Sequence, residues 1–404
     1  MKPVYLDYNA TTPIDSDVAA AMMLFIREEF GNPSSSYSLG IRARQALEKA
    51  RGQVAELLGS KTSEIIFTSG GSESNNMVLK GVALSLRDKG RHIITTGIEH
   101  PAIFNPAIFL IENGWDVTFL PVDGYGSVNP DEVKNAIRKD TVLISVMHAN
   151  NETGTIQPVQ EIGRISRKHG IFFHTDAAQS VGKVKTDVSD LCVDFLSLAG
   201  HKLYAPKGVG ALYIRDGIEI VPLIHGGGQE SGRRAGTENV ILNVALGAAC
   251  ELAGKNIKHD TFRIAALRDR LYDNMVSAIP DATLNGHPDN RLPNTLNISF
   301  TGFKGEKILK RIPNLCASTG AACKDRSATI SHVLAAMGVS RESAIGAIRL
   351  TLGRPTTQDE VDQAAEWIIK AVRKEERGKR KEERGKGKGE RGKGKGERDK
   401  KIIL

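Results

Sequence analysis

The chain has 404 residues, 40% of them hydrophobic and 25% charged, which is typical of a globular protein with room for two domains. This length excludes a minimal binding module, and four cysteines without a CxxC pair argue against a zinc knuckle or a disulfide-stapled miniprotein. The N-terminus has no apolar core, and no run approaches the roughly 18 apolar residues of a membrane helix. We therefore expect a cytoplasmic protein without a membrane segment.

The predicted strands are short apolar runs at 65–68, 92–95, 117–120, 142–146, 171–174, 195–198 and 211–215. Segments with helical spacing, such as 130–138 and 159–168, lie between most of them. This alternation is typical of an α/β domain with a mainly parallel sheet, in which ligands bind beyond the carboxyl ends of the strands. From about residue 250 the pattern changes to a long helical stretch followed by mixed segments, which predicts a smaller α+β domain.

We divide the chain into four parts on this basis. Residues 1–15 are expected to join the small domain, 16–250 to form the large domain, 251–372 to form the small domain, and 373–404 to form a tail. The tail holds 15 of the 55 Lys and Arg and 7 of the 47 Asp and Glu, so the entire net charge of +8 lies there. It contains GKGKGER twice, at 385–391 and 392–398, and no apolar residue before Ile402. We predict a disordered, solubilising extension; nucleic-acid contact is less favoured because no aromatic side chain is present to stack on bases.

Three polar clusters follow predicted strands in the large domain. TSGGSESNN at 68–76 suits a phosphate at a helix N-terminus, although a plain turn with Ser72 as helix cap is an equal alternative. Asp176 follows an apolar strand, where a buried carboxylate needs a cationic partner such as a protonated ring nitrogen. Lys202 lies among small residues, where its amine can lose water and become suited to Schiff-base chemistry, and Lys207 competes for that role.

Further segments extend this series along the chain: YLDYNATTP, GNPSSSYSLG, FTSGGSESNN, GIEHPAI, HANNETGTIQPV, HTDAAQSVGK, GHKLYAPKGVGALY, GGGQESGRRAGTEN, STGAACK and IRLTLGRPTT. Their order resembles the cysteine desulfurase and selenocysteine lyase family of class-V aminotransferase-like proteins. The resemblance runs from about Val4 to Lys370. It implies a fold-type I α/β enzyme that uses pyridoxal 5'-phosphate (PLP), with a large, mainly parallel-sheet domain and a smaller α+β C-terminal domain.

By this resemblance, Lys202 holds PLP as a Schiff base and moves protons at the substrate α-carbon. Asp176 pairs with the ring nitrogen and keeps it protonated, so that the ring can act as an electron sink. His100 stacks on the ring and assists proton transfer, while Asn151 and Gln179 form hydrogen bonds near the phenolic oxygen.

The resemblance also implies how the phosphate is bound. It would contact the backbone N–H of Gly71, the hydroxyl of Ser72 and the side chain of His201, and Thr237 would reach the phosphate of the neighbouring subunit in a homodimer. Ala199 is a departure, because many relatives have a serine there that binds the phosphate.

Arg349 matches the arginine that binds the substrate carboxylate through two parallel hydrogen bonds, and Arg354 is the nearby alternative. Asn32 lies at the family's substrate entrance. No metal site is expected.

Cys323 separates a desulfurase from an aminotransferase, because only the former needs a thiol that attacks the substrate sulfur. It follows a segment of small residues that leaves a thiolate accessible, whereas Cys192, Cys250 and Cys316 have the pattern of buried core thiols. The segment length resembles the group that passes its persulfide to a scaffold or carrier protein. Lys324 departs from the small hydroxyl residues that are frequent there.

The resulting hypothesis is conversion of L-cysteine to L-alanine with a persulfide on Cys323, the sulfur going to iron–sulfur cluster assembly or tRNA thiolation. A selenocysteine lyase, acting on L-selenocysteine, is the nearest alternative because the two site chemistries are shared. An aminotransferase or another β-lyase is a second alternative. A nucleic-acid-binding protein acting through its basic tail is an alternative of another class.

Overall fold

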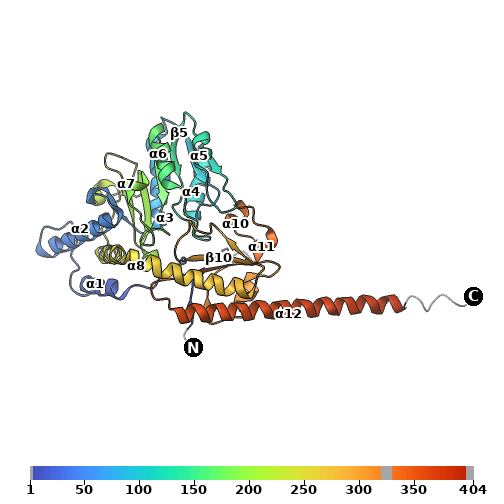
Figure 1. Ribbon diagram of the computed structural model, residues 1–404. Helices are drawn as coiled ribbons and strands as arrows, with labels where there is room; N and C mark the ends of the chain where they lie inside the picture. Colours follow the sequence, from blue (N-terminus) through green and yellow to red (C-terminus); the bar gives the residue numbers. More distant parts are fainter. Residues whose placement is uncertain (1–2, 320–329, 397–404) are drawn as a thin grey trace, which may run out of the picture.

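The computed structural model describes the backbone of residues 3–319 and 330–396, and side chains as far as residue 378. A seven-stranded sheet forms the centre of the larger part of the molecule (Figure 1). Its order is β2-β8-β7-β6-β5-β3-β4, and β8 alone runs antiparallel to its neighbours within it. The strands are β2 (Ile65–Thr68), β3 (His92–Thr96), β4 (Asp116–Leu120), β5 (Thr141–Ser145), β6 (Phe172–Asp176), β7 (Phe195–Ala199) and β8 (Gly210–Ile214).

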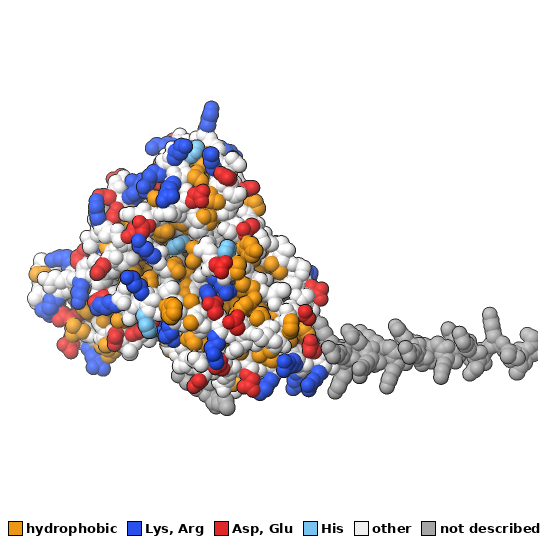
Figure 2. Space-filling view, viewed as in Figure 1, with side chains coloured by type: hydrophobic (Ala, Val, Ile, Leu, Met, Phe, Trp, Pro, Cys, Tyr) orange, Lys and Arg blue, Asp and Glu red, His pale blue; other side chains and the backbone are white. Residues whose placement is uncertain are grey.

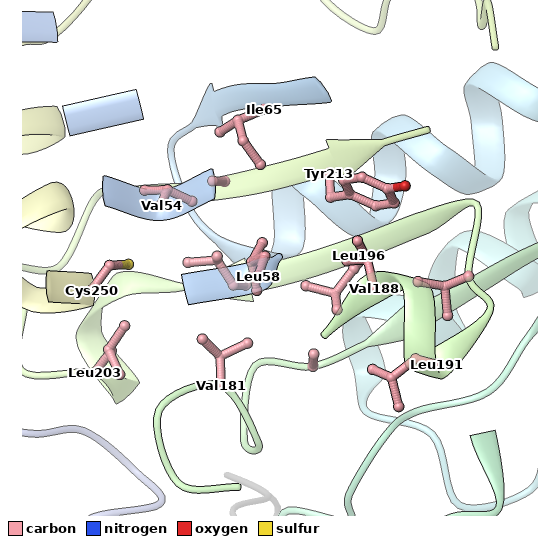
Figure 3. Packing of buried hydrophobic residues seen from close by; sticks show 14 of the residues in the cluster. Val54, Leu58, Ile65, Val181, Val188, Leu191, Leu196, Leu203, Tyr213 and Cys250 are labelled. Carbon is pink, nitrogen blue, oxygen red and sulfur yellow. The ribbon is translucent and has the colours of Figure 1, made fainter. Parts of the chain in front are cut away.

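Helices cover both faces of this sheet, which is why most of its strands are buried along their length and rich in apolar residues rather than alternating. Ile65 of β2 belongs to a core cluster with Val54 and Leu58 of α2 (Figure 3), whereas its neighbour Ile66 belongs to a second cluster with α3 and α4. The helices of this part are α1 (Ser16–Arg27), α2 (Ser38–Leu58), α3 (Gly71–Leu86), α4 (Pro101–Glu112), α5 (Pro130–Ala136), α6 (Val159–His169) and α7 (Val188–Leu191), with short 3-10 turns η1 (Thr62–Glu64), η2 (Gly200–Lys202) and η3 (Gln229–Gly232).

All seven predicted strands are present, which confirms the α/β class with a mostly parallel sheet. Their ends differ from the prediction by one or two residues. The largest difference is in β6, which extends to Asp176 rather than ending at His174. Asp176 is therefore the last residue of a strand, and the sheet fixes the position of its backbone.

The smaller part contains a three-stranded antiparallel sheet in the order β12-β10-β9. The N-terminal strand β1 (Val4–Tyr5) pairs in parallel with β11 (Leu315–Cys316), so the start of the chain packs here. The remaining elements are β9 (Ala282–Asn285), β10 (Thr295–Phe300), β12 (Ala347–Thr351), α9 (Gly305–Lys310), α10 (His332–Ala336), α11 (Arg341–Ile345) and α12 (Gln358–Gly396).

One long helix, α8 (Val240–Ala278), connects the two parts, and the proposed boundary at residue 250 falls inside it. It packs against α1 and α2 of the larger part and against α12 of the smaller part (Figure 1). By length and composition α8 could cross a membrane, a test that a core helix also passes. Ala245, Leu246 and Cys250 of α8 are buried in the main core cluster.

The tail prediction is wrong for residues 373–396, because α12 continues through them as a helix (Figure 1). The first turns of α12 are anchored by Val361, Ile368 and Val372 in the core of the smaller part. Extending an existing helix avoids the cost of nucleation, and Glu, Lys and Arg are good helix formers that offset glycines costing about 1 kcal/mol each. Over the visible face of the body, Lys and Arg side chains are intermixed with Asp and Glu (Figure 2).

The three described cysteines differ in burial. Cys250 is fully buried, as predicted. Cys192 and Cys316 are only partly buried, so the prediction of core thiols is wrong for both. Cys192 ends the short helix α7 in a left-handed conformation, and Cys316 lies on the two-residue strand β11, positions at which one side of the residue remains open to solvent.

Candidate active site

A cavity of about 420 Å³ lies where β6, β7 and the N-termini of α3 and α4 meet. Nine of the twelve predicted site residues line it: Gly71, Ser72, His100, Asn151, Asp176, Gln179, His201, Lys202 and Arg349. These residues come from segments spread over almost 280 positions of the chain. Strands of a parallel sheet end at the same edge, and this is the physical reason that they meet.

Lys202 ends the 3-10 turn that follows β7. Its Nζ donates to the backbone oxygens of Asn9 and Ala10, the latter at 2.7 Å. Burial, followed by the charge of Arg349, lowers the pKa of Lys202 from 10.5 to about 8. The competing Lys207 is exposed and does not line the cavity. Of these two lysines, only Lys202 lines the cavity, and its lowered pKa suits an amine that acts as a nucleophile.

Asp176 presents a buried carboxylate to the cavity, only 7% exposed. One oxygen accepts from Asn75 Nδ2 at 2.7 Å and the other from the backbone N–H of Ala178 at 2.9 Å. The carboxylate of Asp176 forms no ion pair with any residue that the structure describes. Among the same residues, the buried Oδ1 of Asn75 has no hydrogen-bond partner. A buried carboxylate without a cation is costly, so this end of the cavity suits a ligand that carries a protonated nitrogen.

The opposite end of the cavity is the N-terminus of α3, a helix of 16 residues. Gly70 precedes it with φ 149° and ψ 178°, a conformation that is essentially restricted to glycine. Gly70, not Ser72, is the N-cap, so the alternative of a plain turn capped by Ser72 is wrong. The Ser72 side chain is exposed beside the free N–H groups of the first turn, an arrangement that suits a phosphate.

His201 lies at this end as well, next to Lys202. Burial, followed by the charges of Lys202 and Lys207, lowers the pKa of His201 to about 4. The ring is therefore neutral at pH 7, and one of its nitrogens, Nδ1, lies 3.3 Å from the hydroxyl of Thr11.

His100 is the N-cap of α4, and its Nδ1 accepts from the backbone N–H of Ala102 at 3.1 Å. Burial is the main cause of a lowered pKa, so the ring is neutral with its proton on Nε2. The position of Asn151 is set by its neighbour Asn150, whose side chain is buried. The side-chain oxygen of Asn150 accepts from the N–H groups of Glu152 and Thr153, and its nitrogen donates to the backbone oxygen of Ile98, in the turn after β3.

Arg349 enters the cavity from β12 of the smaller part. It donates from Nη1 to the Asn151 oxygen at 3.0 Å and from Nη2 to Asp7 at 2.8 Å. Its buried Nε has no partner among the described residues, which leaves a donor for a carboxylate. Arg354 does not line this cavity; it stacks on Tyr204 at 4.5 Å and pairs with Asp260 at 3.2 Å.

Three predicted residues do not line the cavity. Asn32 is exposed, and its side chain accepts from the N–H of Ser34. Thr237 is exposed on the loop before α8. Arg234 of this loop forms an ion pair at 2.8 Å with Glu73 in the first turn of α3. Cys323 lies outside the described residues. The roles given to these three remain predictions.

Sequence reasoning missed three residues that hold the site together: Asp7, Asn9 and Lys183. Asn9 lies in the segment YLDYNATTP and Lys183 in HTDAAQSVGK. Both segments carry the family resemblance, but the sequence predicts no role for these two side chains. Asn9 contacts Gln179, Lys183 and Asn151 on one side, and Asn294, Thr295 and Thr351 on the other. No periodic pattern signals such a contact, because the partners lie far apart in the sequence.

Within residues 3–319 and 330–396, no group of three or more His, Cys, Asp or Glu side chains could hold a metal ion.

Comparison with known proteins gives consistent results. A family model described as Aminotransferase class-V matches residues 4–364. "Cysteine desulfurase IscS" of Dictyoglomus turgidum is 49% identical over 375 residues, 92% of this chain and 95% of that protein. The protein of the same name from Methanosarcina thermophila is 50% identical and covers 92% of this chain and 93% of its own.

Solved structures agree with these matches. A structure titled "NIFS-LIKE PROTEIN" has a TM-score of 0.86 and 40% identity, covering 92% of this chain and 99% of its own. "SspA in complex with cysteine" has a TM-score of 0.77 and 39% identity, covering 86% and 98%. The chain therefore belongs to the Aminotransferase class-V family and, within it, to the cysteine desulfurase group.

Proposed function

We propose that this protein is a PLP-dependent cysteine desulfurase that converts L-cysteine to L-alanine and leaves the sulfur as a persulfide on Cys323. The observation that carries the proposal is the cavity itself. It combines the amine of Lys202, the carboxylate of Asp176 and the free Nε of Arg349. The names of the relatives and the PLP dependence of their family support the same reaction.

The cavity fits PLP by its donor set. Asp176, with no cation of its own, would hold the ring nitrogen, and the N-terminus of α3 with Ser72 and His201 would hold the phosphate. Lys202 would hold the aldehyde carbon, while Asn151 and Gln179 would contact the phenolic oxygen. When bound, PLP would withdraw electrons from the substrate α-carbon and so weaken the bond from Cβ to sulfur.

The chain's own residues would then act in turn. Arg349 binds the substrate carboxylate with Nε and one Nη, and the second hydrogen of Nη2 allows its contact with Asp7 to remain. Lys202 takes the proton from the α-carbon, and His100, neutral and with its proton on Nε2, covers the cavity. The thiolate of Cys323 forms a bond to the substrate sulfur as the Cβ–S bond breaks, and the carbon keeps the electron pair and gains a proton to become alanine.

A homodimer is part of the proposal. Large apolar side chains are exposed around α1, with Phe30 79% and Ile26 53% exposed, and a patch of this kind favours a partner surface. The exposed Thr237 would reach the phosphate site of the second subunit. We further propose cytoplasmic function away from membranes, with transfer of the persulfide to an acceptor protein; the basic tail is an accessory in this scheme.

The proposal is tested with purified protein supplied with PLP. The expected results are a visible absorbance band that changes on addition of L-cysteine, and equal amounts of alanine and sulfide in the presence of a thiol reductant. Protein that stays colourless would refute it. Parallel assays with L-selenocysteine test the lyase alternative: turnover of L-selenocysteine with none of L-cysteine would identify a selenocysteine lyase.

A further inference from the structure

Lys183 lies behind the active-site wall, partly buried, and the mechanism above gives it no role. It lines a small pocket between the two parts of the molecule rather than the main cavity. Its Nζ donates to Gln179 Oε1 at 3.1 Å and to Asn9 Oδ1 at 3.3 Å. Burial, followed by the charges of Lys202 and Arg349, lowers the pKa of Lys183 to about 7.

The contact with Gln179 determines how that side chain is turned. A primary amide has one oxygen that accepts and one nitrogen that donates twice, and a lysine amine can only donate when charged. While Lys183 is charged, the amide oxygen of Gln179 therefore faces it. Its Nε2 uses one hydrogen on the backbone oxygen of Asn9, at 3.0 Å. Among the described residues the side chain of Gln179 makes no other hydrogen bond, so one N–H remains for a ligand.

We propose that Lys183 is a positioning residue that holds the Gln179 amide with its nitrogen, not its oxygen, available to the phenolic oxygen of the cofactor. This inference rests on the proposed placement of PLP beside Gln179. An ionised phenolic oxygen needs a donor, and a flipped amide would place two lone-pair-bearing oxygens against each other. Lys183 thus acts on the cofactor through another side chain, without touching it.

The consequence is measurable in the bound cofactor before any substrate is added. The visible band of PLP joined to a lysine titrates with pH, and a donor on the phenolic oxygen lowers the midpoint of that titration. In Lys183→Met the contact of Nε2 with the Asn9 oxygen alone opposes a flip of the amide. We expect the midpoint to rise by about 0.5 to 1 pH unit, which corresponds to part of the free energy of one hydrogen bond to an ionised oxygen. Lys183→Arg keeps a side chain that can only donate, so its midpoint should stay close to that of the unmodified protein.

A double-mutant cycle separates this role from a simple effect of charge. If Lys183 acts through Gln179, then Lys183→Met shifts the midpoint no further in a Gln179→Ala background. Additive shifts would show that the charge acts directly and would overturn the inference, as would a midpoint in Lys183→Arg that rises as far as in Lys183→Met. Lys185→Met is the matched control. Lys185 lies two residues after Lys183, is exposed and forms an ion pair with Asp190, so its substitution should leave the midpoint unchanged.

These outcomes are distinct from failure of the proposed function. Unmodified protein without a visible band refutes PLP binding itself. A normal band whose midpoint is the same in the unmodified protein and in Lys183→Met refutes the inference alone. The cofactor dissociation constant, measured by equilibrium dialysis on each variant, should rise with the midpoint in Lys183→Met and not in Lys183→Arg.

Discussion

The loop that carries Thr237 is anchored by a buried ion pair, and breaking this pair tests whether the loop depends on it. Arg51 of α2 and Glu230 form two hydrogen bonds, at 2.6 and 3.0 Å, and their side chains are 10% and 3% exposed. Glu230 also accepts from the backbone N–H of Phe67 at 3.0 Å. Glu230 and Ser231 both have positive φ, 48° and 57°, so the pair holds a strained backbone in place.

We expect Glu230→Gln to lower the free energy of unfolding by about 3 kcal/mol. Removal of one partner of a buried pair costs about 3–5 kcal/mol because it leaves a buried charge uncompensated. The lower end applies here for two reasons. Glutamine retains a hydrogen bond to the backbone, and Glu48 lies 3.2 Å from Arg51 and compensates part of its charge.

The assay is urea unfolding of cofactor-free protein followed by circular dichroism, with Asp216→Asn as the matched control. Asp216 pairs with Lys61, but both side chains are more than half exposed, so its substitution should not shift the transition measurably. A shift in Glu230→Gln no larger than in Asp216→Asn would refute the reasoning. Since the loop carries Thr237, weaker PLP binding should accompany the loss of stability.

Four further outcomes follow from the site. Lys202→Ala should lose the visible band and at least about 10²- to 10⁴-fold in alanine formation, while Lys207→Ala, an exposed control, should retain both; equal losses would refute the assignment. In cofactor-free protein, the rate of PLP attachment should rise with pH and level off above about 8, because only the unprotonated amine of Lys202 attacks; stopped-flow absorbance that keeps rising towards pH 10 would contradict the lowered pKa. Arg349→Lys should raise KM for L-cysteine by about 10- to 100-fold, the loss of one paired hydrogen bond to a carboxylate, and a KM that does not move would exclude this role. Cys323→Ser should abolish persulfide formation, as measured by mass spectrometry, and Cys316→Ser should not.

The sequence predicted the large sheet well because its signal is local. A strand buried on both faces is mostly apolar, and short runs such as those of β2 and β5 stand out from the sequence for this reason. Asp176 and Lys202 could be found for the same reason. A carboxylate or an amine at the end of an apolar strand has few explanations other than a site, and strand ends in a parallel sheet are neighbours by geometry.

The tertiary structure alone decided which polar groups satisfy one another. Asn9 contacts Lys183 across 174 positions and Thr295 across 286, and Arg51 reaches Glu230 across 179. Buried polar groups must find partners, but this requirement does not say where along the chain a partner lies, and it leaves no periodic trace. The same limit applies to the choice of Arg349 over Arg354 and to the helical tail, which depends on the packing of the turns before it.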